Sequence, residues 1–288
     1  MVQLLILSGK GGTGKTTVAG AFIKLRDAKA FADCDVVAPN LHLILPQETG
    51  AVESDFYGMP KAHIDPDLCV SFDLCRQSCR FDAIDHEDGC YAVNPYACEG
   101  CGVCAFVCPA DAVTMGPAVA GELMLYKNEH VFSTAKLKMG SGNSGKLVAE
   151  VKKQMVAAAK KADLAVIDGS PGIGCPVIAS ISGVDMVLVV AEPSISGISD
   201  LERIVKTSEH FDVKLAVCVN KYDTNTANTE KIEAYCKEAK LDFVGRIPFD
   251  SVAAKALNQG LNITEVDCPA GNAIKSVFAN TMHLLYNI

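Results

Sequence analysis

The sequence predicts a doubly wound, mostly parallel α/β sheet that is interrupted by a small α+β domain. Two observations predict the sheet: an apolar run at residues 2–7 leads into a glycine-rich loop, and apolar runs recur at residues 164–168 and 215–219. Strands of a parallel sheet are covered on both faces and therefore read as continuous apolar runs. The small domain is predicted by cysteine density, because eight of the thirteen cysteines lie from Cys69 to Cys108.

The bulk composition narrows the class of protein. With 49% hydrophobic residues, the 288-residue chain can bury a large core without disulfides. Cysteines this dense in a reducing compartment indicate metal or redox chemistry. The net charge of −8 does not favour a protein that coats nucleic acid. No apolar run approaches the roughly 20 residues that span a bilayer, and the chain begins with a strand rather than a basic leader. We therefore expect a cytoplasmic protein without a membrane partner.

The glycine-rich loop after the first strand matches a phosphate-binding motif. Residues 9–16 fit G-x-x-x-x-G-K-[ST] completely, and a helix-like stretch follows at residues 16–25. Backbone N–H groups in such a loop turn toward phosphate oxygens, and the helix N-terminus adds positive potential. We expect Lys15 to reach the β- and γ-phosphates and the Thr16 hydroxyl to ligate Mg²⁺. The predicted nucleotide-binding residues of this loop are Gly9, Lys10, Gly11, Gly12, Thr13, Gly14, Lys15, Thr16 and Thr17.

The residues K-G-G-T-G-K-T-T at positions 10–17 resemble the deviant P-loop of the MinD/ParA/Mrp group and of the nitrogenase iron protein. The resemblance extends over nearly all of residues 1–60 and 120–288. It implies an ATPase whose ATP-bound form is a dimer, in which Lys10 reaches the nucleotide of the other subunit. That subunit is a second copy of this chain or a similar paralogue. The alternative is that Lys10 is a solvated loop lysine.

Two acidic segments agree with this resemblance. Residues 32–41 look like the family's switch I, which implies that Asp35 orients the attacking water and Mg²⁺, with Asp33 as the second choice. A later buried strand ends in Asp168, and we expect this carboxylate to hold the Mg²⁺ shell. The glycine-rich residues 169–174 then form a flexible switch II that can sense the γ-phosphate.

The residues expected to bind the base are compatible with either GTP or ATP. The sequence N-K-x-D from Asn220 to Asp223 is the guanine-reading signature of GTPases, in which the aspartate reads the base. In the MinD/Mrp group the asparagine instead contacts adenine, helped by a later loop that resembles residues 247–250 and includes Pro248. Because the deviant P-loop is similar to that group, the sequence favours ATP.

The cysteines near the middle of the chain follow the spacing of a bacterial ferredoxin. The run C-x2-C-x2-C-x3-C-P begins at Cys98. Structural zinc, the alternative, usually takes two separated C-x2-C pairs. A repeat with an offset of 29 residues matches Cys69, Cys75 and Cys79 to members of this run. The two halves resemble a two-cluster ferredoxin that spans residues 62–116.

The resemblance assigns the cysteines to two clusters, because the fourth cysteine of each run serves the other cluster. The predicted ligands of one [4Fe–4S] cluster are Cys79, Cys98, Cys101 and Cys104. The second site has three thiols, since Phe72 stands where a fourth cysteine is expected; they are Cys69, Cys75 and Cys108. Three thiolates can hold a [3Fe–4S] cluster or a [4Fe–4S] cluster with one open iron. Two alternatives stay open: Cys90 substitutes for the missing ligand, or the second cluster is lost and its cysteines only pack.

The predicted domain order follows from these motifs. The first part of the ATPase is residues 1–61, the ferredoxin-like insertion is residues 62–116, and the second part of the ATPase is residues 117–288. In that second part, residues 122–137 read as a β-hairpin and residues 147–161 as a helix.

Three features separate the chain from individual members of the group. Cys175 lies seven residues after Asp168, the separation at which the nitrogenase iron protein places a cluster-bridging cysteine, but we expect a small buried cysteine that opens a helix. The C-terminal C-x2-C of Mrp-type cluster carriers is absent. The last helix, from residue 273, lacks the basic face of the MinD membrane helix.

Together these patterns predict an ATP-hydrolysing protein that gates electron transfer from an iron–sulfur cluster to a redox partner. The alternative is an ATP-dependent scaffold or carrier that assembles iron–sulfur or mixed-metal clusters for a metal-cluster partner. A third reading, positioning of cargo as ParA and MinD do, is disfavoured by the acidic charge balance and by the missing membrane helix.

Overall fold

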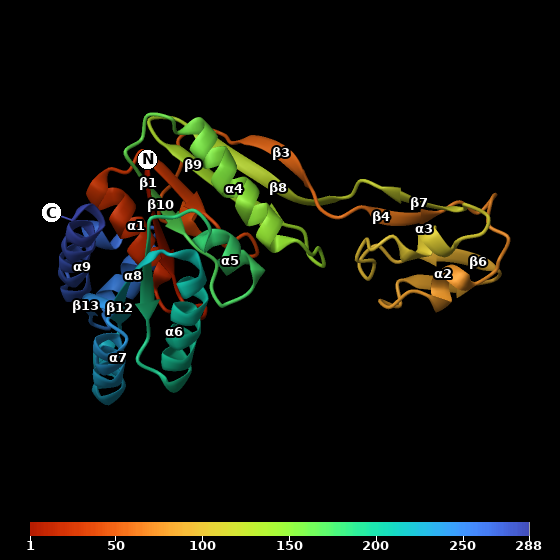
Figure 1. Cartoon of the computed structure of the whole chain (residues 1–288). Helices are drawn as coiled ribbons and strands as arrows, with labels where there is room; N and C mark the ends of the chain where they lie inside the picture. The colour runs from red at the N-terminus through yellow and green to blue at the C-terminus, as the bar shows by residue number, and fades with distance from the viewer. Residues whose placement is uncertain (288) are drawn as a thin grey trace. The chain divides into compact units, whose positions relative to one another are not determined.

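The computed structural model describes residues 1–287, and the chain divides into two compact units. The larger unit comprises Met1–Glu53, Met124–Ala135 and the residues from Gly145 onward. The smaller unit comprises Ser54–Leu123 and Lys136–Ser144. Each unit has its own hydrophobic core and is described separately; Figure 1 labels most of the helices and strands.

A mostly parallel sheet organises the larger unit, although residues 54–57, 119–123 and 136–137 of its strands are grouped with the smaller unit. Its strands are β1 (Val2–Leu7), β2 (Ala30–Asp33), β3 (Val52–Tyr57), β8 (Val119–Lys127), β9 (Val131–Leu137), β10 (Leu164–Asp168), β11 (Met186–Ala191), β12 (Lys214–Asn220) and β13 (Asp242–Ile247). Their order across the sheet is β13-β12-β11-β1-β10-β2-β9-β8-β3. From β13 to β9 every neighbouring pair is parallel, which confirms the predicted sheet type. The expected hairpin is present, since β8 and β9 are neighbours joined by a short turn.

Helices cover both faces of this sheet. The helices of the larger unit are α1 (Lys15–Arg26), α4 (Ser144–Ala158), α5 (Cys175–Ile181), α6 (Ile195–Ser208), α7 (Thr226–Glu238), α8 (Ser251–Asn258) and α9 (Pro269–Tyr286). Short 3₁₀ turns occur at Leu41–Leu43, Glu209–Phe211, Tyr222–Thr224 and Ile263–Glu265. Helices α1 and α9 contribute to one core cluster, whereas α5 and α6 contact β1 and β11 on the other face.

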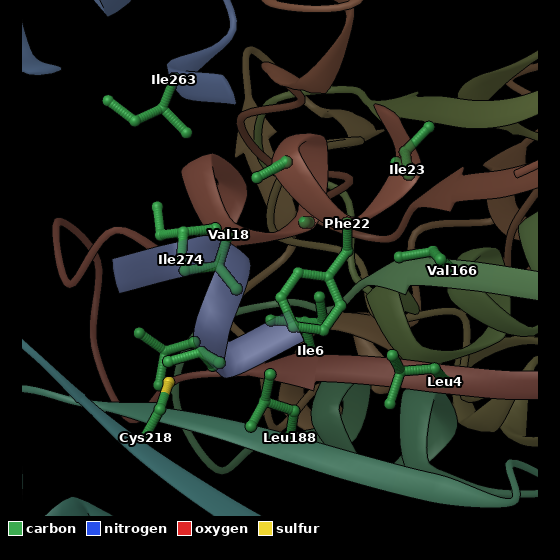
Figure 2. Packing of buried hydrophobic residues seen from close by; sticks show 14 of the residues in the cluster. Leu4, Ile6, Val18, Phe22, Ile23, Val166, Leu188, Cys218, Ile263 and Ile274 are labelled. Atoms are coloured by element: carbon green, nitrogen blue, oxygen red, sulfur yellow. The ribbon is translucent and has the colours of Figure 1, made fainter. Parts of the chain in front are cut away.

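The alternation of side chains along β1 explains why both faces are buried. Leu4 and Ile6 pack in the cluster under α1 and α9, and Leu5 and Leu7 are equally buried but point to the opposite face. Figure 2 shows Leu4 and Ile6 beside Phe22 of α1. Continuous apolar strands are therefore required by the double cover, as the sequence pattern indicates.

Helix α4 contacts both ends of α5. Near the first end, a Cβ atom at Gly145 would lie 3.0 Å from the carbonyl oxygen of Cys175. At the other end, Nζ of the buried Lys152 donates to the carbonyl oxygens of Ser180 and Ser182, at 2.6 Å each. Burial lowers the pKa of Lys152. These carbonyls lie at the C-terminus of α5, where a cation is favourable because the last turn leaves carbonyl groups without helical partners.

The smaller unit contains two antiparallel strand pairs and two short helices. Strand β4 (Lys61–Ile64) pairs with β7 (Val113–Gly116), and β5 (Ile84–Glu87) pairs with β6 (Cys90–Val93). The helices are α2 (Leu74–Gln77) and α3 (Val103–Val107). The chain order β4-α2-β5 is followed by β6-α3-β7, and each element of the second half begins 29 residues after its counterpart. The repeat in the cysteines is therefore also a repeat in the backbone.

Loop conformation repeats with the same offset. Gly100 and Gly102 have positive φ angles of 72° and 77° on either side of Cys101. In the first half, Ser71 and Asp73 hold the equivalent left-handed conformations, with φ angles of 58° and 62°, on either side of Phe72. Left-handed backbone is unfavourable for residues other than glycine. The first half thus keeps the loop shape of the second half although its sequence does not favour that shape.

Candidate functional site

The P-loop connects β1 to α1 and requires glycine at a specific point. Gly14 is the N-cap residue of α1 and has a φ angle of 93°, in the left-handed region. A Cβ atom at this position would lie 2.2 Å from Nδ2 of Asn220. Backbone conformation and the close approach of Asn220 therefore both exclude a larger residue at position 14.

A cavity of about 800 Å³ lies beside the P-loop. This volume is typical of small-molecule sites. The cavity is lined by predicted site residues from distant parts of the sequence: Lys10, Gly11, Gly12, Thr13, Gly14, Lys15, Thr16, Thr17, Asp35, Asn220 and Pro248. Ser170 and Pro171 of switch II also line it. Two predicted residues are not among the lining residues of this cavity, Gly9 and Asp168.

Asp168 does not line the cavity, but it forms an ion pair with Lys15, which does. The Nζ atom of Lys15 lies 2.5 Å from Oδ1 of Asp168, and both side chains are buried. Burial lowers the pKa of Lys15, but the charge of Asp168 and its hydrogen bond outweigh burial, so this pKa lies above its ordinary value. The other carboxylate oxygen, Oδ2, is buried without a hydrogen-bond partner among residues 1–287. A buried, unpartnered carboxylate oxygen fits a ligand of the Mg²⁺ shell.

The two aspartates of switch I have different surroundings. Asp33 is fully buried and accepts hydrogen bonds from the backbone N–H groups of Asp35, Asn40 and Leu41, at 2.9–3.0 Å. Burial and the charge of Asp168 raise the pKa of Asp33 to about 7, against the opposing effect of those N–H donors. Asp35 lines the cavity, and its pKa is also raised, mainly by burial. Asp33 therefore shapes the loop, while Asp35 is the carboxylate that a ligand can reach.

The N-K-x-D segment holds the P-loop rather than offering an open base-reading carboxylate. Nδ2 of Asn220 donates to the carbonyl oxygen of Thr13 at 2.7 Å, and Nζ of Lys221 donates to that of Gly12 at 2.9 Å. Oδ1 of Asp223 accepts a hydrogen bond from the backbone N–H of Phe249 at 2.7 Å, and Asp223 is absent from the cavity lining. The group that reads guanine in GTPases is thus used to fix the loop after β13.

Lys10 lies at the rim of the cavity and contacts the segment between β11 and α6. Its Nζ atom lies 2.9 Å from Oε2 of Glu192 and donates to the hydroxyls of Ser194 and Ser196, at 3.2 and 3.3 Å. Lys10 is therefore partly exposed but has three polar partners in its own chain. Sequence reasoning missed Glu192 and both serines, because nothing in a polar E-P-S-x-S segment after a buried strand indicates which distant residue it contacts.

The cysteines of the smaller unit line two separate hollows. One is lined by the four cysteines predicted for a [4Fe–4S] cluster: Cys79, Cys98, Cys101 and Cys104. The other is lined by the remaining three and by Phe72: Cys69, Cys75 and Cys108. Cys90 is exposed and lines neither hollow, so the structure does not favour it as a substitute ligand. Burial raises the pKa of Cys75 and of Cys104.

The donor set of the first hollow fits an iron–sulfur cluster. Across residues 1–287, no three or more His, Cys, Asp or Glu side chains lie close enough together to hold a single metal ion. A multi-iron cluster spaces its thiolates more widely than one ion does, so this observation concerns a single ion such as Zn²⁺. Four thiols facing one hollow are the ligand set that a cubane cluster takes.

The structure contradicts one further expectation from the sequence. Cys175 opens α5 as expected, but it is exposed, so the expectation of a buried cysteine is wrong. In the described part of the chain, no helix combines the length and apolar character needed to cross a bilayer.

Comparison with known sequences is consistent with this geometry. A family model described as the CobQ/CobB/MinD/ParA nucleotide binding domain matches residues 4–263. An uncharacterized protein of Methanocaldococcus jannaschii is 30% identical over 96% of this chain and 95% of its own length. An iron-sulfur cluster carrier protein of Pyrococcus furiosus is 24% identical over 99% of this chain and 87% of its own length. An uncharacterized ferredoxin of Methanocaldococcus jannaschii is 44% identical over 41 residues, which are 14% of this chain and 25% of that ferredoxin.

Solved structures show the same fold. MinD of Pyrococcus horikoshii in complex with Mg-ADP superposes with a TM-score of 0.58 at 17% identity, covering 98% of this chain and 96% of that chain. MinD of Aquifex aeolicus gives a TM-score of 0.56 at 20% identity, covering 98% and 97%. At these identities the likeness concerns the fold alone.

Proposed function

Because the chain belongs to the CobQ/CobB/MinD/ParA nucleotide-binding family, we propose that it binds and hydrolyses MgATP and that the nucleotide gates electron transfer from an iron–sulfur cluster to a partner protein. The observation that carries this proposal is the convergence of four cysteines on one hollow in a chain that also has a P-loop cavity. The ATP-bound form is a dimer, either of two copies or with a similar paralogue.

At the phosphates, the buried ion pair supplies the binding groups. Without nucleotide, Lys15 neutralises Asp168. A γ-phosphate competes for the ammonium group of Lys15, and Asp168 can then use both carboxylate oxygens to hold the Mg²⁺ shell together with the Thr16 hydroxyl. Asp35 lines the same cavity and orients the attacking water. These roles follow the family pattern and are supported by the unpartnered Oδ2 atom of Asp168.

The base is adenine in this proposal. Guanine recognition needs a carboxylate that faces the base, and the carboxylate of Asp223 instead accepts the N–H of Phe249. The carboxylate of Asp223 is also absent from the cavity lining, so it is not placed to accept the N–H groups of a guanine bound there. Pro248 and Phe249 leave an apolar wall of the cavity for the base, and Asn220 holds the P-loop beside it.

The smaller unit is proposed as the ferredoxin-like insertion, with residues 62–116 as its cluster-binding part. Cys79, Cys98, Cys101 and Cys104 would hold one [4Fe–4S] cluster, which when bound supplies a one-electron redox centre. The βαβ order of each half and the 29-residue repeat support this assignment. A match of 41 residues to a ferredoxin of Methanocaldococcus jannaschii also supports it.

The three-thiol hollow is proposed as a second, incomplete cluster site. The support is the left-handed backbone of Ser71 and Asp73, which keeps the shape of the equivalent glycine loop around Phe72. Residues held in sparsely populated backbone conformations cluster at functional sites, because the surrounding structure must overcome their cost. Cys69, Cys75 and Cys108 would hold a [3Fe–4S] cluster or a [4Fe–4S] cluster with one open iron.

Electron paramagnetic resonance of anaerobically purified, reduced protein tests gating. We expect a [4Fe–4S] signal whose midpoint potential shifts with MgATP in the wild type but not in Lys15→Ala. Cys101→Ala should lose this signal, whereas the matched variant Cys90→Ala should keep it, because Cys90 lines neither hollow. A signal that ignores MgATP in protein that still hydrolyses ATP contradicts gating.

A cluster carrier is the second candidate function. It is favoured by the incomplete three-thiol hollow and by relatives described as iron-sulfur cluster carrier proteins. A carrier should pass its cluster to an apo-ferredoxin faster when MgATP is present, which visible absorbance of the acceptor would report. The MinD-like fold also suits ATP-dependent positioning of cargo, and retention of the ATP form on DNA or liposomes would favour that function.

A further inference from the structure

Glu192 connects two lysines that flank the P-loop. It follows directly after β11, and its side chain is 23% exposed. One carboxylate oxygen lies 2.9 Å from Nζ of Lys10, and the other lies 3.7 Å from Nζ of Lys221. Burial raises the pKa of Glu192, but hydrogen bonds and charge from the two lysines outweigh burial and lower it. The charged carboxylate is therefore the form that the two lysines stabilise.

The backbone next to Lys10 is fixed against the same segment. A Cβ atom at Gly9 would lie 2.0 Å from Cβ of Asp200 in α6, so the start of the P-loop packs directly on this helix. Ser194 is the N-cap residue of α6 and accepts from the N–H of Gly197 while it also receives Lys10. Several groups of the β11–α6 segment thus converge on Lys10, rather than one flexible side chain meeting another by chance.

The ammonium group of Lys10 cannot keep these contacts and also contact a nucleotide that is bound to another subunit. A lysine that reaches the nucleotide of a second copy must first leave Glu192, Ser194 and Ser196 of its own copy. A competing contact in the free state lowers the apparent affinity for the second subunit, because only the molecules that do not hold this contact can bind. Lys221 remains close to Glu192 after Lys10 has left and can neutralise its carboxylate.

We propose that Glu192 is a positioning residue that retains Lys10 within its own subunit in the absence of ATP, and that dimer formation requires the transfer of Lys10 from Glu192 to the nucleotide of the second subunit. The first half of this inference stands on the contacts of the single copy. The second half rests on the proposed function, because it needs the ATP-dependent dimer.

Lysine acylation tests the first half without any dimer. The nucleotide-free protein is treated with a limiting amine-acylating reagent, and the rate at Lys10 is measured by mass spectrometry. We expect Glu192→Gln to raise this rate about threefold, which corresponds to about 0.7 kcal/mol and lies in the range for a partly exposed ion pair. Glu202→Gln, the same charge change at an exposed position of α6, should leave the rate unchanged. An unchanged rate in Glu192→Gln overturns the inference.

Sedimentation with a non-hydrolysable ATP analogue tests the second half. Because each dimer uses two copies of Lys10, Glu192→Gln should tighten the dimer about tenfold. Binding of MgADP to the single subunit should not change, which separates retention of Lys10 from a general change in the site. Lys10→Ala should abolish the dimer, and Lys10→Ala/Glu192→Gln should not recover it.

The outcomes separate this inference from the proposed function. A Glu192→Gln dimer no tighter than wild type overturns the competition between Glu192 and the nucleotide. If the wild type forms no ATP-dependent dimer, the proposed dimer is wrong, and the acylation rate at Lys10 alone decides whether Glu192 retains this lysine.

Discussion

The ammonium group of Lys15 and the carboxylate of Asp168 form a buried ion pair, with Nζ 2.5 Å from Oδ1. The pair joins the first turn of α1 to the end of β10, two segments that are more than 150 positions apart in the sequence. It therefore fixes the P-loop against the centre of the sheet before any nucleotide binds.

Replacement of Lys15 should lower the free energy of unfolding and weaken nucleotide binding. Lys15→Met leaves the carboxylate of Asp168 buried and unpaired, and we expect a loss of about 3 kcal/mol in the free energy of unfolding. Urea unfolding measures this loss. Lys24→Met is the control, because its ion pair with Glu265 is exposed and should contribute less than about 1 kcal/mol. Equal losses in the two variants would contradict the structural role of the buried pair.

Nucleotide preference should not depend on the carboxylate charge of Asp223. Asp223→Asn keeps an acceptor for the N–H of Phe249, so ATP affinity should stay near that of the wild type. Asp223→Ala removes the acceptor and should weaken ATP binding about fivefold, the loss expected for one hydrogen bond. Competition between a fluorescent ATP analogue and unlabelled ATP or GTP provides the measurement. Strong competition by GTP that disappears in Asp223→Asn would identify a guanine site instead.

Stability should fall in alkali partly because of Cys218. Burial raises the pKa of this thiol from 9.0 to about 12. Below about pH 9 both the folded and the unfolded chain keep the proton. Above it the unfolded chain releases the proton and the folded chain does not, so stability decreases as pH rises toward 12. Cys218→Ala should reduce this slope by up to about 1.4 kcal/mol per pH unit in urea unfolding between pH 9 and 10.

Glycine at position 71 should stabilise the smaller unit. Ser71 has a φ angle of 58°, and Ser71→Gly removes the cost of that conformation, about 1 kcal/mol. The reverse change at the equivalent position, Gly100→Ser, should destabilise, because a Cβ atom there would lie 2.2 Å from the carbonyl oxygen of Pro60. Hydrogen exchange of the full chain, followed at amides of β4 to β7, separates this unit from the sheet. Faster exchange in Ser71→Gly than in the wild type would contradict the prediction.

The sequence predicts the parts of this protein that depend on local pattern. Apolar runs identify β1 and β10 because a doubly covered strand has no polar side, and the spacing of Cys98 and Cys101 reflects one continuous loop. The partners of Lys10 and the use of Asp223 could not be predicted, since each depends on loops that meet only when the sheet order is known. The exposure of Cys175 was also missed, because a short apolar helix gives no signal of which residue of its first turn remains uncovered.

The contact between Lys152 and the end of α5 determines how this helix can respond to a ligand. The last carbonyl groups of α5 are held by an ammonium group from α4, whereas Pro176 in its first turn lines the nucleotide cavity. The first residue of α5, Cys175, packs against Gly145 of α4, so both ends of α5 contact α4. A displacement of switch II by the γ-phosphate should therefore move α5 and α4 together rather than α5 alone.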